Sequence, residues 1–394
     1  MRIKLELSPD TTFLSQLIYE GVLYALSSAP RSSFSFNKVD LPDDFLCAAY
    51  REMNDERISE ISIVLTGNDK VEKLLGSLRI QEKLPKKTYR ELLKMLKEKC
   101  QDIPIEREEI TLQTKIKGKN VFLDEPERSD LAAPQLFKID RYTGISMLEM
   151  GLTSEQLGLR SSPEAILIGL MGIYSSHITT VRQQDRAYHY FVFLSPDEIA
   201  GLLSSGDHHK LKNIYSIKES LRELLSETLR SSVTSEIMVL EVMLSTKIRS
   251  ELESKNLDKV DFNIFKISPE GQTYKIYETV PITVYRNPMF YEILQKRGIR
   301  ADKVCEELYE ALSPGGAIME ALASFNSMNK YNEADAILRG VLGLYRFVSL
   351  ADAQGLLQFL RSLEEACTIL KDDKRANYRV REYTRIMRGL SYAL

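Results

Sequence analysis

Hydrophobic and polar residues recur with two different periods along this chain. They alternate in residues 3–7, 109–123, 260–267 and 274–284, a pattern that is typical of β-strands. Between residues 12 and 27 the apolar positions are instead three and four apart, which predicts a helix. A glycine interrupts the second alternating segment and a Ser-Pro-Glu-Gly turn separates the last two, so we expect a β-hairpin in each place.

Helical patterns dominate the rest of the chain. One helix is predicted to begin at the Ser-Pro-Glu sequence of residues 162–164, where proline takes a favoured first-turn position. Its apolar residues surround it on nearly all sides, so we expect this helix to be buried. Residues 188–194 are expected to form a strand. Further helices are predicted over 196–204, 208–230 and 234–254, and over almost all of the chain after Pro288. The expected fold class is α+β, with a mixed α/β N-terminal and central part carrying β-hairpins and an all-helical C-terminal domain.

The length of 394 residues exceeds one ordinary hydrophobic core and suggests two or three domains. A connection rich in proline and aspartate, residues 123–144, and the end of the second hairpin mark candidate boundaries. We therefore expect an α/β N-terminal domain with a basic hairpin over 1–130, a helix-rich central domain with a second β-hairpin over 131–285, and a helical C-terminal domain over 286–394.

Composition limits the partners and the compartment. The chain has 53 basic and 56 acidic residues, whereas a protein that coats DNA by itself is usually basic overall. Contact with nucleic acid must therefore be local, or be shared with other subunits. The N-terminus is charged where a signal peptide needs an apolar core, and the longest apolar stretch, residues 165–174, is shorter than the roughly 20 residues of a membrane span. We expect a cytoplasmic protein with no membrane partner.

The four cysteines are Cys47, Cys100, Cys305 and Cys367, and none lies within 50 residues of another. This spacing excludes a Cys-x-x-Cys zinc or redox motif. It also argues against a disulfide framework and fits a reducing compartment.

No catalytic, metal or cofactor motif is evident. The glycines reproduce neither phosphate-binding loop, and no nucleophile elbow is present. The adjacent His208 and His209 would point about 100° apart on a helix, so we expect a solvated helix end there instead of a metal site. Arg182 and His189 match the loose Arg-x4–6-His pattern of HEPN-type ribonucleases, but those enzymes hold it on a helix, and His189 lies in an expected strand. We expect a non-catalytic protein without metal or cofactor, and keep a metal-independent ribonuclease as the less favoured alternative.

Lysines alternate in the first hairpin, at Lys115, Lys117 and Lys119. If the strand persists through Gly118, all three lie on one face and Ile116 on the other. Such a ladder could contact a phosphate backbone, or it could protect an edge strand against aggregation.

The C-terminal segment is the second basic region. Between Lys371 and Leu394 seven basic residues stand against three acidic ones. Arg381, Arg385 and Arg388 share one helical face with Tyr378, and arginine with tyrosine suits phosphate contact combined with base stacking. The alternative is a solvated face, or one that pairs with acidic neighbours.

Two weaker candidates complete the set. Lys83, Lys86, Lys87 and Arg90 surround the start of an expected helix, a place where backbone donors favour anions, although solvation is the simpler role. Three tyrosines on or beside the second hairpin are expected to pack on the sheet and not to stack on bases: Tyr274, Tyr277 and Tyr285.

Three segments together resemble the large subunit of the archaeal type I-A CRISPR surveillance complex, Cascade. They are Lys-Ile-Asp-Arg-Tyr-Thr-Gly at residues 138–144, Ser-Pro-Glu-Ala-Ile-Leu-Ile-Gly-Leu-Met-Gly-Ile-Tyr-Ser-Ser at 162–176, and Tyr-Lys-Ile-Tyr-Glu-Thr-Val-Pro at 274–281. The length, the mixed first part and the helical C-terminal part are also similar, so the resemblance covers most of the chain.

The resemblance implies a non-catalytic, nucleic-acid-binding subunit at the end of the complex that carries the 5′ handle of the crRNA. Such a subunit contributes to recognition of the protospacer-adjacent motif, to strand separation and to recruitment of a helicase–nuclease effector. The implied partners are crRNA, target DNA and the other Cascade subunits. No residue role is carried over, so the basic clusters are candidates on physical grounds alone. The alternative is a protein-binding scaffold or regulatory module with helical surfaces at 208–254 and 288–394.

Overall fold

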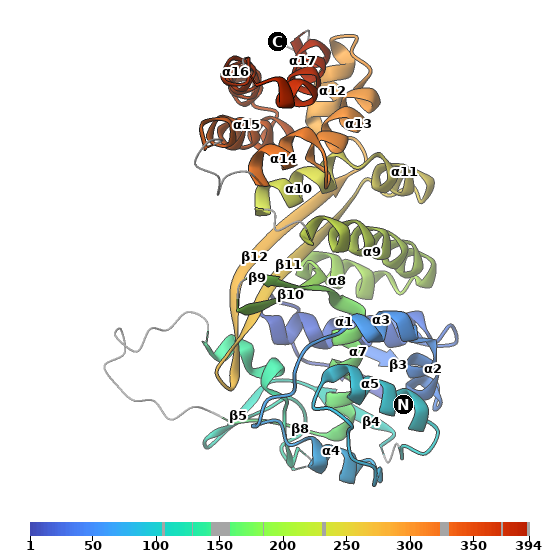
Figure 1. Ribbon diagram of the computed structural model, residues 1–394. Coiled ribbons are helices and arrows are strands. Elements are labelled where there is room, and N and C mark those ends of the chain that lie inside the picture. The colour runs from blue at the N-terminus through green and yellow to red at the C-terminus, as the bar shows by residue number, and fades with distance from the viewer. Residues whose placement is uncertain are drawn as a thin grey trace. The chain divides into compact units, whose positions relative to one another are not determined.

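The computed structural model describes residues 1–104, 107–127, 129–142, 158–183, 185–230, 234–323, 331–371 and 373–391. The chain forms two compact units: unit 1 comprises Met1–Ser216 and Asp261–Pro281, and unit 2 comprises Ile217–Val260 and Ile282–Leu394. Mixed α/β structure in the N-terminal and central parts and helices in the C-terminal part confirm the expected fold class (Figure 1). The Thr143 and Gly144 end of the first resembling segment lies outside the described residues.

The first sheet of unit 1 is built around the N-terminal strand. Its order is β2-β3-β1-β4, in which β1 pairs parallel with β4 and antiparallel with β3. The strands are β1 (Arg2–Leu5), β2 (Ser33–Ser35), β3 (Lys38–Asp40) and β4 (Glu109–Leu112). The alternation at residues 3–7 therefore identified an interior strand of this sheet.

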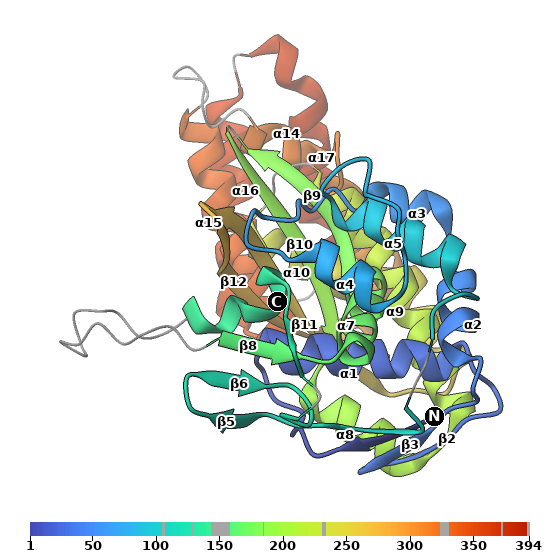
Figure 2. The same cartoon turned by 90° about the horizontal axis from the view of Figure 1, so that it is seen from below.

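The second sheet holds the basic hairpin. Its order is β5-β6-β8-β7, and Figure 2 shows β6 beside both β5 and β8. The strands are β5 (Lys115–Lys117), β6 (Asn120–Phe122), β7 (Leu131–Ala132) and β8 (Gly158–Ser161). The predicted hairpin is confirmed as β5–β6, but β4, which we expected to continue it, belongs to the first sheet.

The expected boundary at residue 130 does not match the division into units. β6 pairs in parallel with β8, which joins residues on opposite sides of that position. The buried Asp124 carboxylate also accepts a hydrogen bond from the Ser162 backbone N–H at 3.1 Å. Composition marked this connection as a linker, yet pairing across it makes it part of unit 1.

The third sheet contains the second predicted hairpin, which is confirmed. Its order is β12-β11-β10-β9, with β9 (His177–Gln183), β10 (Arg186–Leu194), β11 (Lys259–Glu270) and β12 (Thr273–Tyr285). Phe191, Phe193 and Phe265 on one face all contact the ring of Phe13 edge-on. This face therefore packs on the helix that begins at Phe13, α1 (Phe13–Ser27).

Two helices cross closely in the core of unit 1. The helix predicted at residues 162–164 is α7 (Pro163–Ser176), and the Ser162 hydroxyl caps it by accepting from the Ala165 N–H. A Cβ at Gly21 of α1 would lie 1.9 Å from the Ile168 carbonyl oxygen of α7. Glycine is therefore required for this approach, and α7 is buried almost throughout, as predicted. The other helices of unit 1 are α2 (Phe45–Glu52), α3 (Asp55–Glu60), α4 (Val71–Ser77), α5 (Tyr89–Lys99), η1 (Gln135–Tyr142) and α8 (Pro196–Ser205).

The expectation that the cysteines remain unpaired is wrong for two of them. Cys47 on α2 and Cys100 at the end of α5 form a disulfide. Their sequence separation of 53 gave no indication of this pairing, which arises because α2 and α5 pack against each other in the fold. Cys305 and Cys367 are free.

Unit 2 is helical. Helix α9 (His208–Leu229) enters it from unit 1. The segment 234–254 contains two helices where we expected one, because the chain turns at Ser245, whose hydroxyl caps the second. The remaining elements are α10 (Ser235–Leu244), α11 (Thr246–Ser254), α12 (Met289–Lys296), α13 (Ala301–Leu312), α14 (Ala317–Ala323), α15 (Tyr331–Leu350), α16 (Ala353–Ile369), η4 (Lys374–Ala376) and α17 (Asn377–Leu390).

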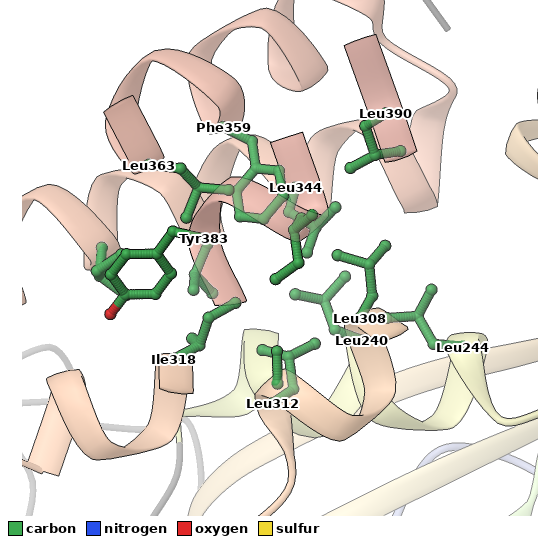
Figure 3. Close-up of a cluster of buried hydrophobic side chains, with 14 of the residues drawn as sticks. Leu240, Leu244, Leu308, Leu312, Ile318, Leu344, Phe359, Leu363, Tyr383 and Leu390 are labelled. Carbon is green, nitrogen blue, oxygen red and sulfur yellow. The ribbon is translucent and has the colours of Figure 1, made fainter. Parts of the chain in front are cut away.

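The core of unit 2 combines an apolar cluster with a buried ion pair. Leucines, isoleucines and aromatic rings from α10 and α13–α17 point toward one another (Figure 3). Beside them the buried Glu333 carboxylate accepts hydrogen bonds from Arg379 Nε at 2.8 Å and Nη2 at 3.0 Å, and from the Tyr383 hydroxyl at 3.1 Å. These bonds tie the last helix to α15.

Within the described ranges, no helix has both the length and the apolar character needed to cross a membrane.

Candidate nucleic-acid interface

The last helix presents the predicted arginine face. Arg381, Arg385 and Arg388 are exposed on α17, while Tyr383 and Ile386 on the same helix are buried in the core of unit 2. The apolar residues fix the rotation of the helix, because burying them leaves the three guanidinium groups outside.

A hollow of about 630 Å³ lies between α17 and the first turns of α13. Five of its lining residues are cationic, and we call them the basic groove: Arg300, Lys303, Arg381, Arg385 and Arg388. Among the described residues that line it, Glu307 is the only acidic one. Two helices that are far apart in sequence thus supply the cations of one concave surface.

The α13 wall adds a favourable backbone field. Arg300 is the N-cap residue of this twelve-residue helix and Lys303 lies in its first turn. The N-terminus of a helix carries partial positive charge and unpaired N–H groups, which favour anions. Both the side chains and the helix end therefore attract negative charge.

Internal pairing leaves most of this charge available. Lys303 lies 3.7 Å from Glu307, and Arg385 lies 3.4 Å from Glu310 and 2.7 Å from Glu382. The cations of these pairs are exposed although Glu307 and Glu382 are partly buried, and solvent-exposed pairs are worth only about 0–1 kcal/mol, so Lys303 and Arg385 remain accessible to a phosphate. In the part of the chain that the structure describes, Arg300, Arg381 and Arg388 have no carboxylate within 4.0 Å.

Tyr378 lies outside the groove lining. Its side chain is exposed on α17 one turn before Arg381, as the helical spacing predicted. Its ring is therefore accessible, but the structure does not place it on the wall of the hollow.

The lysine ladder of the hairpin is shorter than expected. Lys115 and Lys117 are exposed on β5, but the strand ends there, because Gly118 has φ +59° and forms the turn. Lys119 lies in that turn, so the alternation does not extend to it. One face of the strand therefore carries two lysines in place of the expected three. Lys117 also lies 3.7 Å from Glu127 in an exposed ion pair.

The basic residues around the start of α5 differ in their exposure to solvent. Lys86 and Lys87 are exposed before the Thr88 cap, and Lys87 lies 3.5 Å from Glu72. Arg90 is half-buried in the first turn of α5, and Lys83 lines a separate hollow of about 350 Å³ together with Lys87. This cluster therefore offers fewer outward cations than the basic groove.

The ribonuclease alternative depends on His189, and this histidine is buried. His189 lies on β10, as predicted, and is 2 % exposed, with its Nδ1 2.8 Å from the Thr180 hydroxyl. Burial lowers its pKa to about 4, so the ring is neutral near pH 7, while Arg182 is exposed on β9. No group of three or more potential metal ligands occurs among the residues that the structure describes.

A sequence relative extends over the whole chain. An uncharacterized protein of Archaeoglobus fulgidus is 43 % identical over 396 residues, and the alignment covers 100 % of both chains. The chain belongs to the same family as this archaeal protein. No family model matches the chain, and no solved structure matches it.

Arg300 and Lys303 were missed by the sequence analysis. They belong to a basic segment, residues 296–303, that contains Lys296, Arg297, Arg300 and Lys303. That density of charge was a usable signal. What the sequence could not show is that α13 packs beside α17 and so brings this segment to the arginine face.

Proposed function

We propose that this chain is a non-catalytic, nucleic-acid-binding subunit of a CRISPR RNA-guided DNA surveillance complex in the cytoplasm. The observation that carries the proposal is the basic groove, in which α13 and α17 direct five cationic side chains into one hollow. The groove binds the phosphate backbone of the nucleic acid.

The side chains of the groove are well suited to contact with phosphate. Four of its five cations are arginines, whose planar guanidinium groups can donate two parallel hydrogen bonds to one phosphate. The chain as a whole has a net charge of −3, so this attraction is local and would be supplemented by other subunits.

The resemblance to the Cascade large subunit supplies the wider role. In it the chain would join crRNA, target DNA and sister subunits, contribute to recognition of the protospacer-adjacent motif and to strand separation, and recruit the helicase–nuclease effector. The groove is assigned to backbone contact, because clustered cationic side chains supply the sequence-independent, electrostatic part of nucleic-acid binding.

A charge-neutralising variant tests the groove. Arg381→Gln, Arg385→Gln and Arg388→Gln together should weaken binding to an oligonucleotide of roughly 20 nucleotides, the length of a guide heteroduplex, at least about tenfold. The slope of log K against log salt should fall by about 2–3, since each lost phosphate contact removes about 0.7–0.9. Fluorescence anisotropy over a salt series measures both quantities.

The matched control removes three exposed arginines of the same unit that lie on α15 and α16: Arg339→Gln, Arg346→Gln and Arg361→Gln. It changes the net charge equally and should lower the salt slope much less. Equal losses in the two triple variants, or no loss in the first, would remove the groove from the proposal.

Co-purification tests the complex. Affinity-tagged chain isolated from its native cells should bring short guide RNA and sister subunits. Recovery of protein partners without RNA, in assemblies resistant to nuclease, would favour the scaffold alternative.

A further inference from the structure

A second surface with aromatic and cationic side chains lies in unit 1, on the third sheet. It comprises Arg186 and Tyr188 on β10, Lys266 on β11 and Tyr277 on β12, and we call it the tyrosine face. Side chains alternate along a strand, so Arg186 and Tyr188 lie opposite to Phe191 and Phe193, which pack on α1. The tyrosine face is therefore the side of the sheet directed away from that helix.

The four side chains touch one another. The ring of Tyr188 meets that of Tyr277 at 5.4 Å between centroids and 87° between planes. Lys266 Nζ lies 4.6 Å from the Tyr188 ring centroid, and Arg186 Nη1 donates to the Tyr277 hydroxyl at 3.0 Å. Both rings are thus held in fixed orientations with a cation beside each.

The tyrosine face is accessible to solvent. Tyr277 is 41 % exposed and Arg186 is exposed, while Tyr188 and Lys266 are half-buried. A perpendicular pair leaves at least one face of each ring uncovered by the other ring. On the same hairpin Tyr274 is 1 % exposed and gives its hydroxyl to the Val64 carbonyl, which is the packing role that we expected for all three tyrosines.

We propose that the tyrosine face binds unpaired bases of a single-stranded nucleic acid. Tyr277 stacks on a base, Tyr188 holds the Tyr277 ring in place, and Arg186 and Lys266 contact the adjacent phosphates. Every base has a flat π-surface, so rigid tyrosines bind single strands with little dependence on sequence, and nearby cations follow the backbone. Bases in a duplex are already stacked on their neighbours, which makes the face selective for single strands.

This inference rests on the proposed function, since it assumes that the partner is nucleic acid, but it concerns other residues and another part of the ligand. The basic groove contacts phosphates, and the tyrosine face stacks on bases. Probes that lack bases therefore separate the two.

The experiment uses the full chain and two fluorescent probes of equal length, an oligothymidylate and an abasic oligonucleotide with the same phosphates. Tyr277→Ala should weaken binding to oligothymidylate about tenfold, the loss expected for one stacked base, and leave binding to the abasic probe unchanged. Tyr277→Phe, which keeps the ring and loses only the bond to Arg186, should remain within about threefold of the wild type on both probes. Tyr285→Ala is the control, because Tyr285 is an equally exposed tyrosine of β12 that lies eight residues along the strand from Tyr277 and is not one of the four residues of the tyrosine face.

Each outcome has one consequence. Selective loss for the oligothymidylate in Tyr277→Ala, with recovery in Tyr277→Phe, supports the inference. Wild-type affinity of Tyr277→Ala for both probes overturns it and makes the face a structural surface of the sheet, while leaving the groove untouched. Failure of the wild-type chain to bind either probe overturns the proposed function as well.

Discussion

Each of the two units is stabilised internally by its own kinds of interaction. In unit 1, residues far apart in sequence meet in three sheets, a glycine-mediated helix crossing and a disulfide. In unit 2, helices pack on an apolar cluster, and an ion pair, Glu333 with Arg379, is buried beside it. The difference is one of strand pairing and a covalent cross-link in unit 1 against helix packing in unit 2, because close backbone approach occurs in both: a Cβ at Gly355 of α16 would lie 2.5 Å from the Gly343 carbonyl oxygen of α15.

The candidate binding residues follow the same division. Unit 2 concentrates cations in a concave surface between two helices, whereas unit 1 carries cations on a hairpin, ahead of a helix and beside tyrosines on a sheet. Helix packing can bring two basic segments together without strand pairing. A sheet instead presents alternate side chains on one flat face, which suits base stacking better than enclosure of a phosphate.

The buried ionic group should give the largest stability effect in the molecule. Arg379→Met leaves the Glu333 carboxylate buried without its cation, and we expect a loss of about 4 kcal/mol in the free energy of unfolding of unit 2. Urea unfolding followed by circular dichroism measures the change, since unit 2 is helical.

Arg339→Met is the matched control for Arg379→Met. Arg339 on α15 lies 2.9 Å from Glu365, but both side chains are about half exposed, so the expected loss is below about 1 kcal/mol. Similar losses in the two variants would show that burial of the Glu333 pair has no special role.

The disulfide should give the corresponding effect in unit 1. It closes a loop of 53 residues, and we expect Cys47→Ser to lower the free energy of unfolding by about 3 kcal/mol, chiefly by freeing the unfolded chain. Reductant should lower the wild-type value by a similar amount and leave the variant unchanged. Cys367→Ser, at a free and half-buried cysteine, is the control: it keeps the disulfide, so reductant should lower its free energy of unfolding as it does for the wild type. Equal sensitivity of wild type and Cys47→Ser would contradict the pairing.

Local patterns predicted the elements of the fold well. Alternation identified β1, β10 and the β11–β12 hairpin, and the Ser-Pro-Glu start identified α7, because period and capping are properties of neighbouring residues. Contacts between distant segments were not predictable in this way. The assignment of β4 and β5 to different sheets and the Cys47–Cys100 pairing each depend on tertiary packing.

The candidate site shows the same limit. Helical spacing placed Arg381, Arg385 and Arg388 on one face correctly, since rotation along a helix is fixed by its geometry. The opposite wall, Arg300 and Lys303, required knowledge that α13 packs beside α17. The prediction that Lys119 shares a face with Lys115 and Lys117 failed because Gly118 has a positive φ. The turn at this glycine ends the strand, and with it the alternation of side chains.

The last stability effect concerns a buried carboxyl group in unit 2, whose replacement should raise the free energy of unfolding instead of lowering it. Glu241 on α10 is 1 % exposed and accepts a hydrogen bond from the Thr228 hydroxyl. Burial, with the nearby Glu227 charge, raises its pKa from 4.5 to about 7. Because folding favours the protonated form, this contribution to stability is complete below about pH 4.5 and is lost as pH rises through about 7.

Glu241→Gln removes that loss, because an amide keeps an oxygen for Thr228 and never ionises. At about pH 8 we expect the variant to exceed the wild type by about 3 kcal/mol in the free energy of unfolding, and at about pH 4.5 to differ from it little. Urea unfolding at the two pH values measures this, with Glu253→Gln, an exposed position of α11, as the control of equal charge. A difference between variant and wild type that is the same at both pH values would show that Glu241 does not titrate between them. The two variants thus test opposite changes in the same helical unit. Arg379→Met should destabilise it by leaving the buried Glu333 charge without its cation, and Glu241→Gln should stabilise it by removing a buried charge that has only a hydroxyl beside it.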